Sequence, residues 1–192
     1  GNGVISILIG LFFVLIDVDL YTEFGVFGIL PDFVGYFLIM RGCAQLRKES
    51  KKIKKTGFWC MLLAVATVLT YGAKALGLAL VSTPLATVFA VIETLAPIVI
   101  LVLIVEGIRE IEIDSAADLK TKWLFRLLVP YGASQVLALV FSVSNRDVKD
   151  VFNYAAVACS FLYLALLAFS VRKYVAVKKE NAVKESDPPE EG

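Results

Sequence analysis

Four apolar stretches, each long enough to cross a lipid bilayer, constrain this chain more than any other feature of its sequence. A transmembrane helix needs about 20 mostly apolar residues, and the stretches that reach this length are 57–81, 85–105, 123–143 and 151–171. Hydrophobic residues make up 58% of the 192 residues, above the roughly 45–50% of an ordinary soluble domain. The sequence therefore predicts an integral membrane protein. It disfavours a disordered chain, a disulfide-rich secreted domain and a basic nucleic-acid-binding protein.

The N-terminal part of the chain is less regular and predicts two shorter spans. Asp17 and Asp19 follow the first apolar segment, and Pro31-Asp32 precedes the second. Proline at the first helical position beside an acid favours a helix start, because the N–H that proline lacks has no partner there and the helix dipole favours the carboxylate. We therefore expect two short spans, at about 3–20 and 31–47. The apolar loop that joins them, at about 20–31, is expected to be interfacial or re-entrant.

The number of apolar spans predicts the fold class. Two short and four long spans indicate an all-α, polytopic transmembrane bundle of about six helices in three hairpins, forming a single membrane domain over 1–177. The segment 178–192 is polar and ends in Asp-Pro-Pro-Glu-Glu-Gly. Such a composition is typical of disorder, so we expect a disordered cytoplasmic tail there.

The distribution of Lys and Arg predicts the orientation in the membrane. Sixteen of the 19 Lys and Arg residues lie in three segments, namely 41–55, 106–126 and 172–192. Because short loops rich in Lys and Arg stay cytoplasmic, we expect a multi-pass plasma-membrane protein with both termini in the cytoplasm. The seven cations of 41–55 favour contact with anionic lipid, at about 1 kcal/mol for each cation near the surface. The amphipathic segment 106–118 is expected to extend the preceding helix into the cytosol.

Lys74 and Glu93 form the first candidate site. The two residues are equally far from the predicted hairpin turn at 82–84, so antiparallel helices place them at one depth. An ionised group within a membrane helix costs about 2.5–3.5 kcal/mol on insertion scales, which favours pairing of an acid with a base. Pro97, one turn after Glu93, frees a backbone carbonyl there. Two interpretations stay open: a structural ion pair, or a proton or cation site at Glu93 that is gated by Lys74.

Four acids without a local counter-charge form the second candidate site. Residues 1–40 contain no Lys or Arg, and hard cations prefer oxygen ligands such as carboxylates. Asp17 ends the first predicted span and Asp32 begins the second, so we expect these two to lie close together at the outer boundary. The acids are either solvated loop residues or part of a cation-binding or substrate-entry site. The full set is Asp17, Asp19, Glu23 and Asp32.

The sequence favours a non-enzymatic role. It contains no His, which excludes His-based general acid–base catalysis and the usual zinc sites. The motifs HExxH and GxGD and a Walker lysine loop are absent as well. We therefore expect no cofactor other than a cation, whose identity the sequence does not define.

The segment LPDFVGY at 30–36, preceded by LFFVLIDVDL, carries a family resemblance. Residues 8–46 resemble the N-terminal region of uncharacterised small multi-pass membrane proteins of Gram-positive bacteria, which have an LPDFxGY-type motif. The resemblance implies a bacterial plasma-membrane protein and implies no activity. It also implies that the following positions are shared by the family: Asp17, Pro31, Asp32, Gly35 and Tyr36.

Two functions follow as hypotheses. In the first, the chain is a small transporter or sensor of a cation or of protons, in which the outer acids collect the ion and Glu93 with Lys74 forms the intramembrane switch. In the second, it is a non-transporting membrane subunit or scaffold whose cytoplasmic loops recruit a partner. A homodimer would enclose a wider path than one chain of this size.

Overall fold

The computed structural model describes residues 2–16, 19–22, 25–28, 32–46, 48, 50–75, 84–142 and 144–186. Within these residues it contains six α-helices: α1 (Asn2–Leu15), α2 (Asp32–Leu46), α3 (Lys51–Ala75), α4 (Pro84–Ser115), α5 (Thr121–Phe141) and α6 (Arg146–Ser186). Helices α3 to α6 are long and apolar enough to cross a membrane, and α1 is a shorter apolar helix. The predicted multi-pass helical bundle is therefore confirmed.

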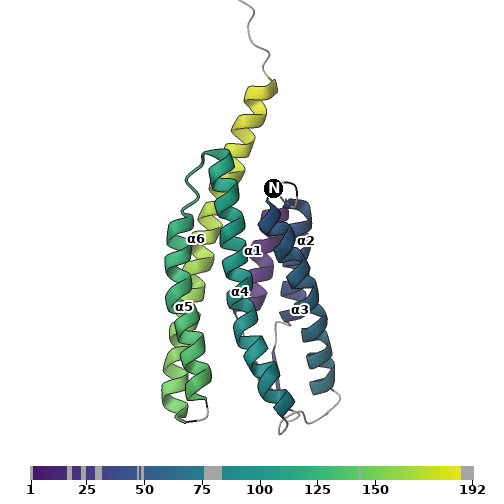
Figure 1. Ribbon diagram of the computed structural model, residues 1–192, viewed down its shortest axis with the longest axis vertical. Helices are drawn as coiled ribbons and strands as arrows, with labels where there is room; N and C mark the ends of the chain where they lie inside the picture. The colour runs from purple at the N-terminus through teal and green to yellow at the C-terminus, as the bar shows by residue number, and fades with distance from the viewer. Residues whose placement is uncertain are drawn as a thin grey trace, which may run out of the picture.

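The six helices pack in a closed ring that follows the order of the chain. Each helix contacts the next one, and α1 also contacts α6, which closes the ring. Figure 1 shows the short helices α1 and α2 against the upper part of the longer ones. The described parts of the three segments rich in Lys and Arg lie together at that end, which we call the basic end (Figure 1).

The helix boundaries differ from the predicted spans in several places. Helix α1 ends at Leu15 rather than near residue 20, and α3 begins at Lys51 rather than at residue 57. The predicted extension of the fourth helix beyond residue 105 is confirmed as far as Ser115. The ends predicted at residues 81 and 143 lie outside the described residues.

Helix α6 shows the largest difference from the prediction. It continues to Ser186, so residues 178–186 are helical where a disordered tail was expected. Polarity does not by itself break a helix, since Ala, Lys and Glu have high helix propensity, and the first proline after this segment is Pro188. Lys178 also stabilises the helix, because its ammonium group lies 5.6 Å from the centre of the Tyr174 ring, one turn earlier. The prediction for 187–192 lies outside the described residues.

A short β-hairpin occupies most of the predicted loop between α1 and α2. Strands β1 (Asp19–Thr22) and β2 (Gly25–Gly28) pair antiparallel, with Asp19 opposite Gly28 and Thr22 opposite Gly25. Tyr, Thr, Val and Phe favour strands, and this enrichment explains the hairpin that the sequence analysis did not predict. The structure does not test the predicted interfacial or re-entrant position of this segment, which stays a prediction.

Two pairs of glycines bring α1 and α2 into backbone contact. A Cβ atom built on Gly42 would lie 2.4 Å from the carbonyl oxygen of Gly3, and one on Gly35 would lie 2.7 Å from the carbonyl oxygen of Gly10. Only glycine fits at such distances. Small residues at helix contacts are typical of membrane proteins, because close approach increases the packing between helices. We call these four residues the glycine seam.

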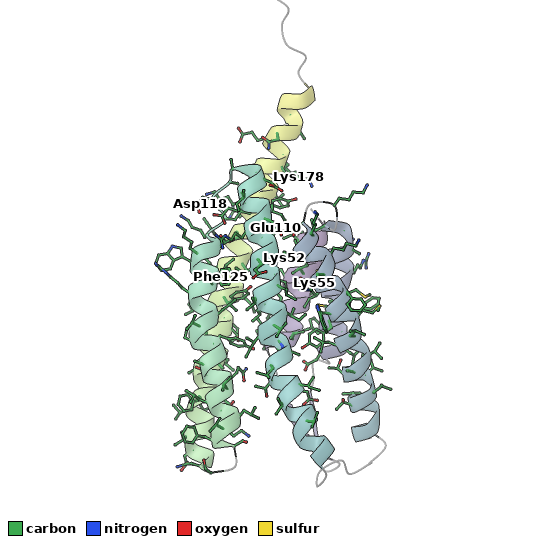
Figure 2. All side chains as sticks on the ribbon, viewed as in Figure 1. Lys52, Lys55, Glu110, Asp118, Phe125 and Lys178 are labelled. Carbon is green, nitrogen blue, oxygen red and sulfur yellow. The ribbon has the colours of Figure 1, made fainter. Side chains whose placement is uncertain are left out.

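The acids at the C-terminal end of α4 bind the N-termini of two neighbouring helices. Figure 2 shows one of them, Glu110, near Lys52 of α3. Ser50 precedes α3, and its hydroxyl accepts the Ile53 N–H at 3.1 Å and donates to the Glu110 carboxylate. Glu112 accepts the hydroxyl and the N–H of Thr121, the first residue of α5. These bonds satisfy donors that a helix start leaves without partners. Helix α4 thereby joins α3 and α5 at the basic end.

Candidate functional site

The four predicted outer acids are only partly described by the structure. Asp17 and Glu23 lie outside the described residues, and Asp19 is described by its backbone alone, as the first residue of β1. Asp32 is the first residue of α2 and is half-buried. Among the described residues, no group of three or more His, Cys, Asp or Glu could hold a metal ion. The predicted approach of Asp17 to Asp32 stays a prediction.

Glu93 lies in the N-terminal half of α4, where its side chain is exposed. Lys74 belongs to the described backbone of α3, but its side chain is outside the described part of the structure. The predicted ion pair of these two residues therefore stays a prediction. Pro97 lies inside α4, and because proline lacks an N–H it leaves the carbonyl of Glu93 without its intrahelical partner. Glu93 thus offers carboxylate and carbonyl oxygens at one position of the helix.

Tyr36 lies within electrostatic range of both Asp32 and Glu93. Its side chain on α2 is only 2% exposed, and among the neighbouring groups that act electrostatically on its hydroxyl Asp32 has the largest effect, followed by Cys60, Tyr131 and Glu93. Asp32 precedes Tyr36 by one helical turn, whereas Glu93 comes from α4 and Tyr131 from α5. Asp32 and Glu93, which the sequence analysis assigned to separate sites, therefore both act on one buried hydroxyl, although the Glu93 side chain itself is exposed. We call Asp32, Tyr36, Glu93 and Tyr131 the central polar cluster.

Helix α5 contributes Tyr131 at the point where it faces the proline turn of α4. A Cβ atom on the adjacent Gly132 would lie 3.7 Å from the Ile98 side chain, so this part of α5 lies beside the residue that follows Pro97. Tyr131 is buried, and its hydroxyl accepts a 3.4 Å hydrogen bond from the Gln135 side chain one turn later. The cluster thus continues along α5 as a short row of polar groups.

Tyr163 of α6 adds an unusual buried hydroxyl to the interior of the ring. Its side chain is 1% exposed, and its hydroxyl has no hydrogen-bond partner among the described residues. An unpaired buried hydroxyl costs free energy. Ser160, one turn earlier, donates instead to the carbonyl of Ala156 on its own helix.

The central polar cluster combines groups that suit a proton or a small cation. Carboxylates bind protons and hard cations, and phenol hydroxyls both donate and accept hydrogen bonds. Acids inside a membrane protein occur mainly on the pathways of ions and protons.

Tyr36 and Tyr131 were not among the candidate site residues that the sequence predicted. Tyr36 was noted only within the family resemblance, although its position one turn after Asp32 was a readable signal for a shared helix face. Nothing in the sequence indicates that Tyr131 and Glu93 approach this face, because that depends on how α2, α4 and α5 pack.

The fold and the cluster together define a class, a polytopic helical membrane protein with acids among its spanning helices. Comparison of the chain with protein-family models, with curated proteins and with solved structures gave no match. A function is therefore inferred from the residues of this chain. The resemblance of residues 8–46 to small membrane proteins of Gram-positive bacteria stays a prediction.

Proposed function

We propose that this protein binds a proton or a small monovalent cation at the central polar cluster, and transports or senses it across the plasma membrane. The observation that carries the proposal is that Asp32 and Glu93, which come from two helices, both lie within electrostatic range of the buried Tyr36 hydroxyl. Acids within helical membrane bundles occur mainly on the pathways of ions and protons. A proton or a small cation is the ligand that such carboxylates bind.

The arrangement of Lys and Arg supports an orientation with the basic end in the cytoplasm. The segments 41–55, 106–126 and 172–186 lie at one end of the bundle (Figure 1), as the positive-inside rule requires of cytoplasmic loops. The entrance to the cluster then faces the opposite side, where α2 begins at Asp32. This orientation is tested by introducing a single cysteine at position 144 or at position 178 and labelling it from outside intact cells. Only the cysteine at position 144 should react, and the reverse pattern would refute the orientation.

Proton flux into proteoliposomes tests the proposed function directly. The purified protein is reconstituted with a pH-sensitive dye inside the vesicles, and a K⁺ gradient with valinomycin supplies the driving force. We expect uptake with the wild type, and loss of most of it with Glu93→Gln or Asp32→Asn, since neither amide binds a proton. Na⁺ and K⁺ gradients, with an ion-selective dye, test the cation alternative.

Asp150→Asn is the matched control for these variants. Asp150 is an exposed acid near the start of α6 and contacts none of the residues of the central polar cluster among the described residues. Its variant should transport like the wild type. Equal flux from wild type and Glu93→Gln, with both inserted and monodisperse, would refute the proposal.

The length of α6 favours the second hypothesis, a membrane subunit that recruits a partner. Its 41 residues span about 60 Å at about 1.5 Å per residue, whereas a bilayer with its headgroups is about 40–45 Å thick. The C-terminal turns therefore project beyond the other helices (Figure 1), where a partner can bind them. This hypothesis would be supported if the protein showed no flux, co-purified with a partner, and lost that partner when the chain was truncated after Lys173.

A further inference from the structure

A pocket of about 510 Å³ lies between the C-terminal end of α4 and the first turns of α5. Three cations line it: Arg109 from α4, and Lys122 and Arg126 from α5. All three side chains are exposed, and none forms an ion pair within the described part of the chain. The pocket is therefore a concave surface with unneutralised positive charge.

The acid in this pocket does not cancel that charge. Glu112 is the only acid among the lining residues, and its carboxylate is already used by the hydroxyl and the N–H of Thr121. The N-terminus of α5, which begins at Thr121, adds the positive end of a helix dipole. The three cations and the helix start attract a negatively charged ligand, and the single carboxylate that would repel it is already hydrogen-bonded.

The remaining walls of the pocket are apolar. Phe125 is partly buried, and Ile113 is 70% exposed. Trp123, also exposed, lies on the same turn of α5, with the Arg126 guanidinium 4.8 Å from the centre of its ring. Tryptophan is enriched where the hydrocarbon meets the headgroups, which places the pocket at the headgroup level of the leaflet. Charged and apolar groups side by side suit a ligand that has both characters.

We propose that this pocket binds the headgroup phosphate of an anionic phospholipid from the leaflet at the basic end. The guanidinium groups of Arg109 and Arg126 hydrogen-bond the phosphate oxygens, as arginine does in other phosphate sites, and Lys122 adds a third charge. Phe125 and Ile113 contact the glycerol and the first methylenes of the acyl chains. Basic pockets between helices on the cytoplasmic side are a known way to bind such lipids. The lipid would join α4 to α5 next to the Glu112–Thr121 contact.

Lipid retention measured by native mass spectrometry tests this proposal. The full chain is purified in a mild detergent and incubated with phosphatidylglycerol, phosphatidylcholine or inorganic phosphate. We expect phosphatidylglycerol to bind at least tenfold more tightly than phosphatidylcholine. Each of Arg109→Gln, Lys122→Gln and Arg126→Gln should weaken its binding about fivefold, from the usual contribution of one cation near an anionic surface.

Lys179→Gln and Arg172→Gln are the matched controls, because both residues are exposed cations at the basic end outside this pocket and outside the segment 41–55. They should leave the binding of phosphatidylglycerol within twofold of the wild type. Arg109→Lys keeps the charge and should retain most of the binding, so a loss in Arg109→Gln is separable from misfolding.

Three results would overturn the proposal. The first is equal retention of phosphatidylglycerol by the wild type and by the variant with all three cations replaced. The second is equal loss in the control variants, which would indicate attraction to the whole basic end. The third is binding of inorganic phosphate as tight as that of the lipid, which would indicate a site for a free anion. None of these measurements depends on flux, so the result is separate from the outcome of the transport assay.

Discussion

Replacement of Gly42 by alanine tests how tightly the glycine seam holds α1 against α2. The new Cβ would lie 2.4 Å from the carbonyl oxygen of Gly3 and 2.6 Å from a side-chain carbon of Ile7. Ordinary contact begins at 3.4 Å, so the shortfall to the carbonyl is about 1 Å. The position of the Cβ atom is fixed by the backbone of α2, and the carbonyl oxygen belongs to the backbone of α1. No side-chain rotation therefore relieves this contact. The helices must separate locally by about that distance.

The cost of this separation is that of an overpacked core, about 1–3 kcal/mol. The better helix propensity of alanine offsets up to about 1 kcal/mol of it. We therefore expect Gly42→Ala to lower the free energy of unfolding by about 1–2 kcal/mol, measured by titration with sodium dodecyl sulfate and followed by circular dichroism. Gly72→Ala is the matched control, because a Cβ at Gly72 in α3 would meet nothing within 4 Å. Its stability should be unchanged or higher.

A second substitution in the seam provides a sharper check. Gly35→Ala should also destabilise, since its Cβ would meet the carbonyl oxygen of Gly10 at 2.7 Å. Once one alanine has separated the helices, the second costs less, so the double variant should lose less than the sum of the single losses. Full additivity, or a Gly42→Ala variant as stable as Gly72→Ala, would refute the account of the seam.

Three further predictions concern single side chains. Ser50→Ala removes the cap of α3 and should lower the free energy of unfolding by about 1 kcal/mol, whereas Ser144→Ala, at an exposed serine, should have little effect. Tyr163→Phe removes a buried hydroxyl without a described partner, so stability should stay equal or rise by up to about 1 kcal/mol; a loss of that size would indicate a bound water. The hydrogen bond from Lys120 holds the pKa of Asp118 below its ordinary value of 3.8. The carboxylate therefore contributes stability that is complete above about pH 4 and is lost as the pH falls through the lowered pKa. The stability of Asp118→Asn, measured as a function of pH, should lack this loss at acidic pH. A pH profile equal to that of the wild type would contradict the prediction.

The length of the apolar runs was sufficient to predict the helical membrane fold. Residues 57–81, 85–105, 123–143 and 151–171 each contain most of one long helix, because a bilayer span requires about 20 apolar residues wherever it occurs. The start of α2 near Asp32 was equally readable, since an acid in the first turn acts through the local helix dipole. Such features depend on neighbours in the sequence alone.

Features that depend on packing were not predicted. The glycines of the seam recur at intervals of seven, from Gly3 to Gly10 and from Gly35 to Gly42, but only the register of α1 against α2 shows that they meet. The C-terminal part of α6 was expected to be disordered because it is polar, although polar residues with high helix propensity extend a helix that is already nucleated.

The candidate site shows the same division between local and distant information. The depth of Glu93 was predicted from its distance to the hairpin turn and stays a prediction, whereas its position relative to Tyr36 depends on how the helices pack. The capping of α3 by Glu110 and of α5 by Glu112 is likewise invisible in the sequence, where these acids look like solvated residues of an amphipathic helix.

The shortness of α2 has an electrical consequence. Its 15 residues span about 22 Å, about three quarters of a hydrocarbon layer of about 30 Å. In the proposed orientation Leu46 lies at the cytoplasmic boundary, and a proton that reached Asp32 from the other side would have crossed about a quarter of the potential. Since a full crossing is worth about 2.3 kcal/mol per 100 mV, proton occupancy at this carboxylate would change about threefold for each 100 mV. The resting voltage of the cell would thereby act on the same carboxylate as the external pH.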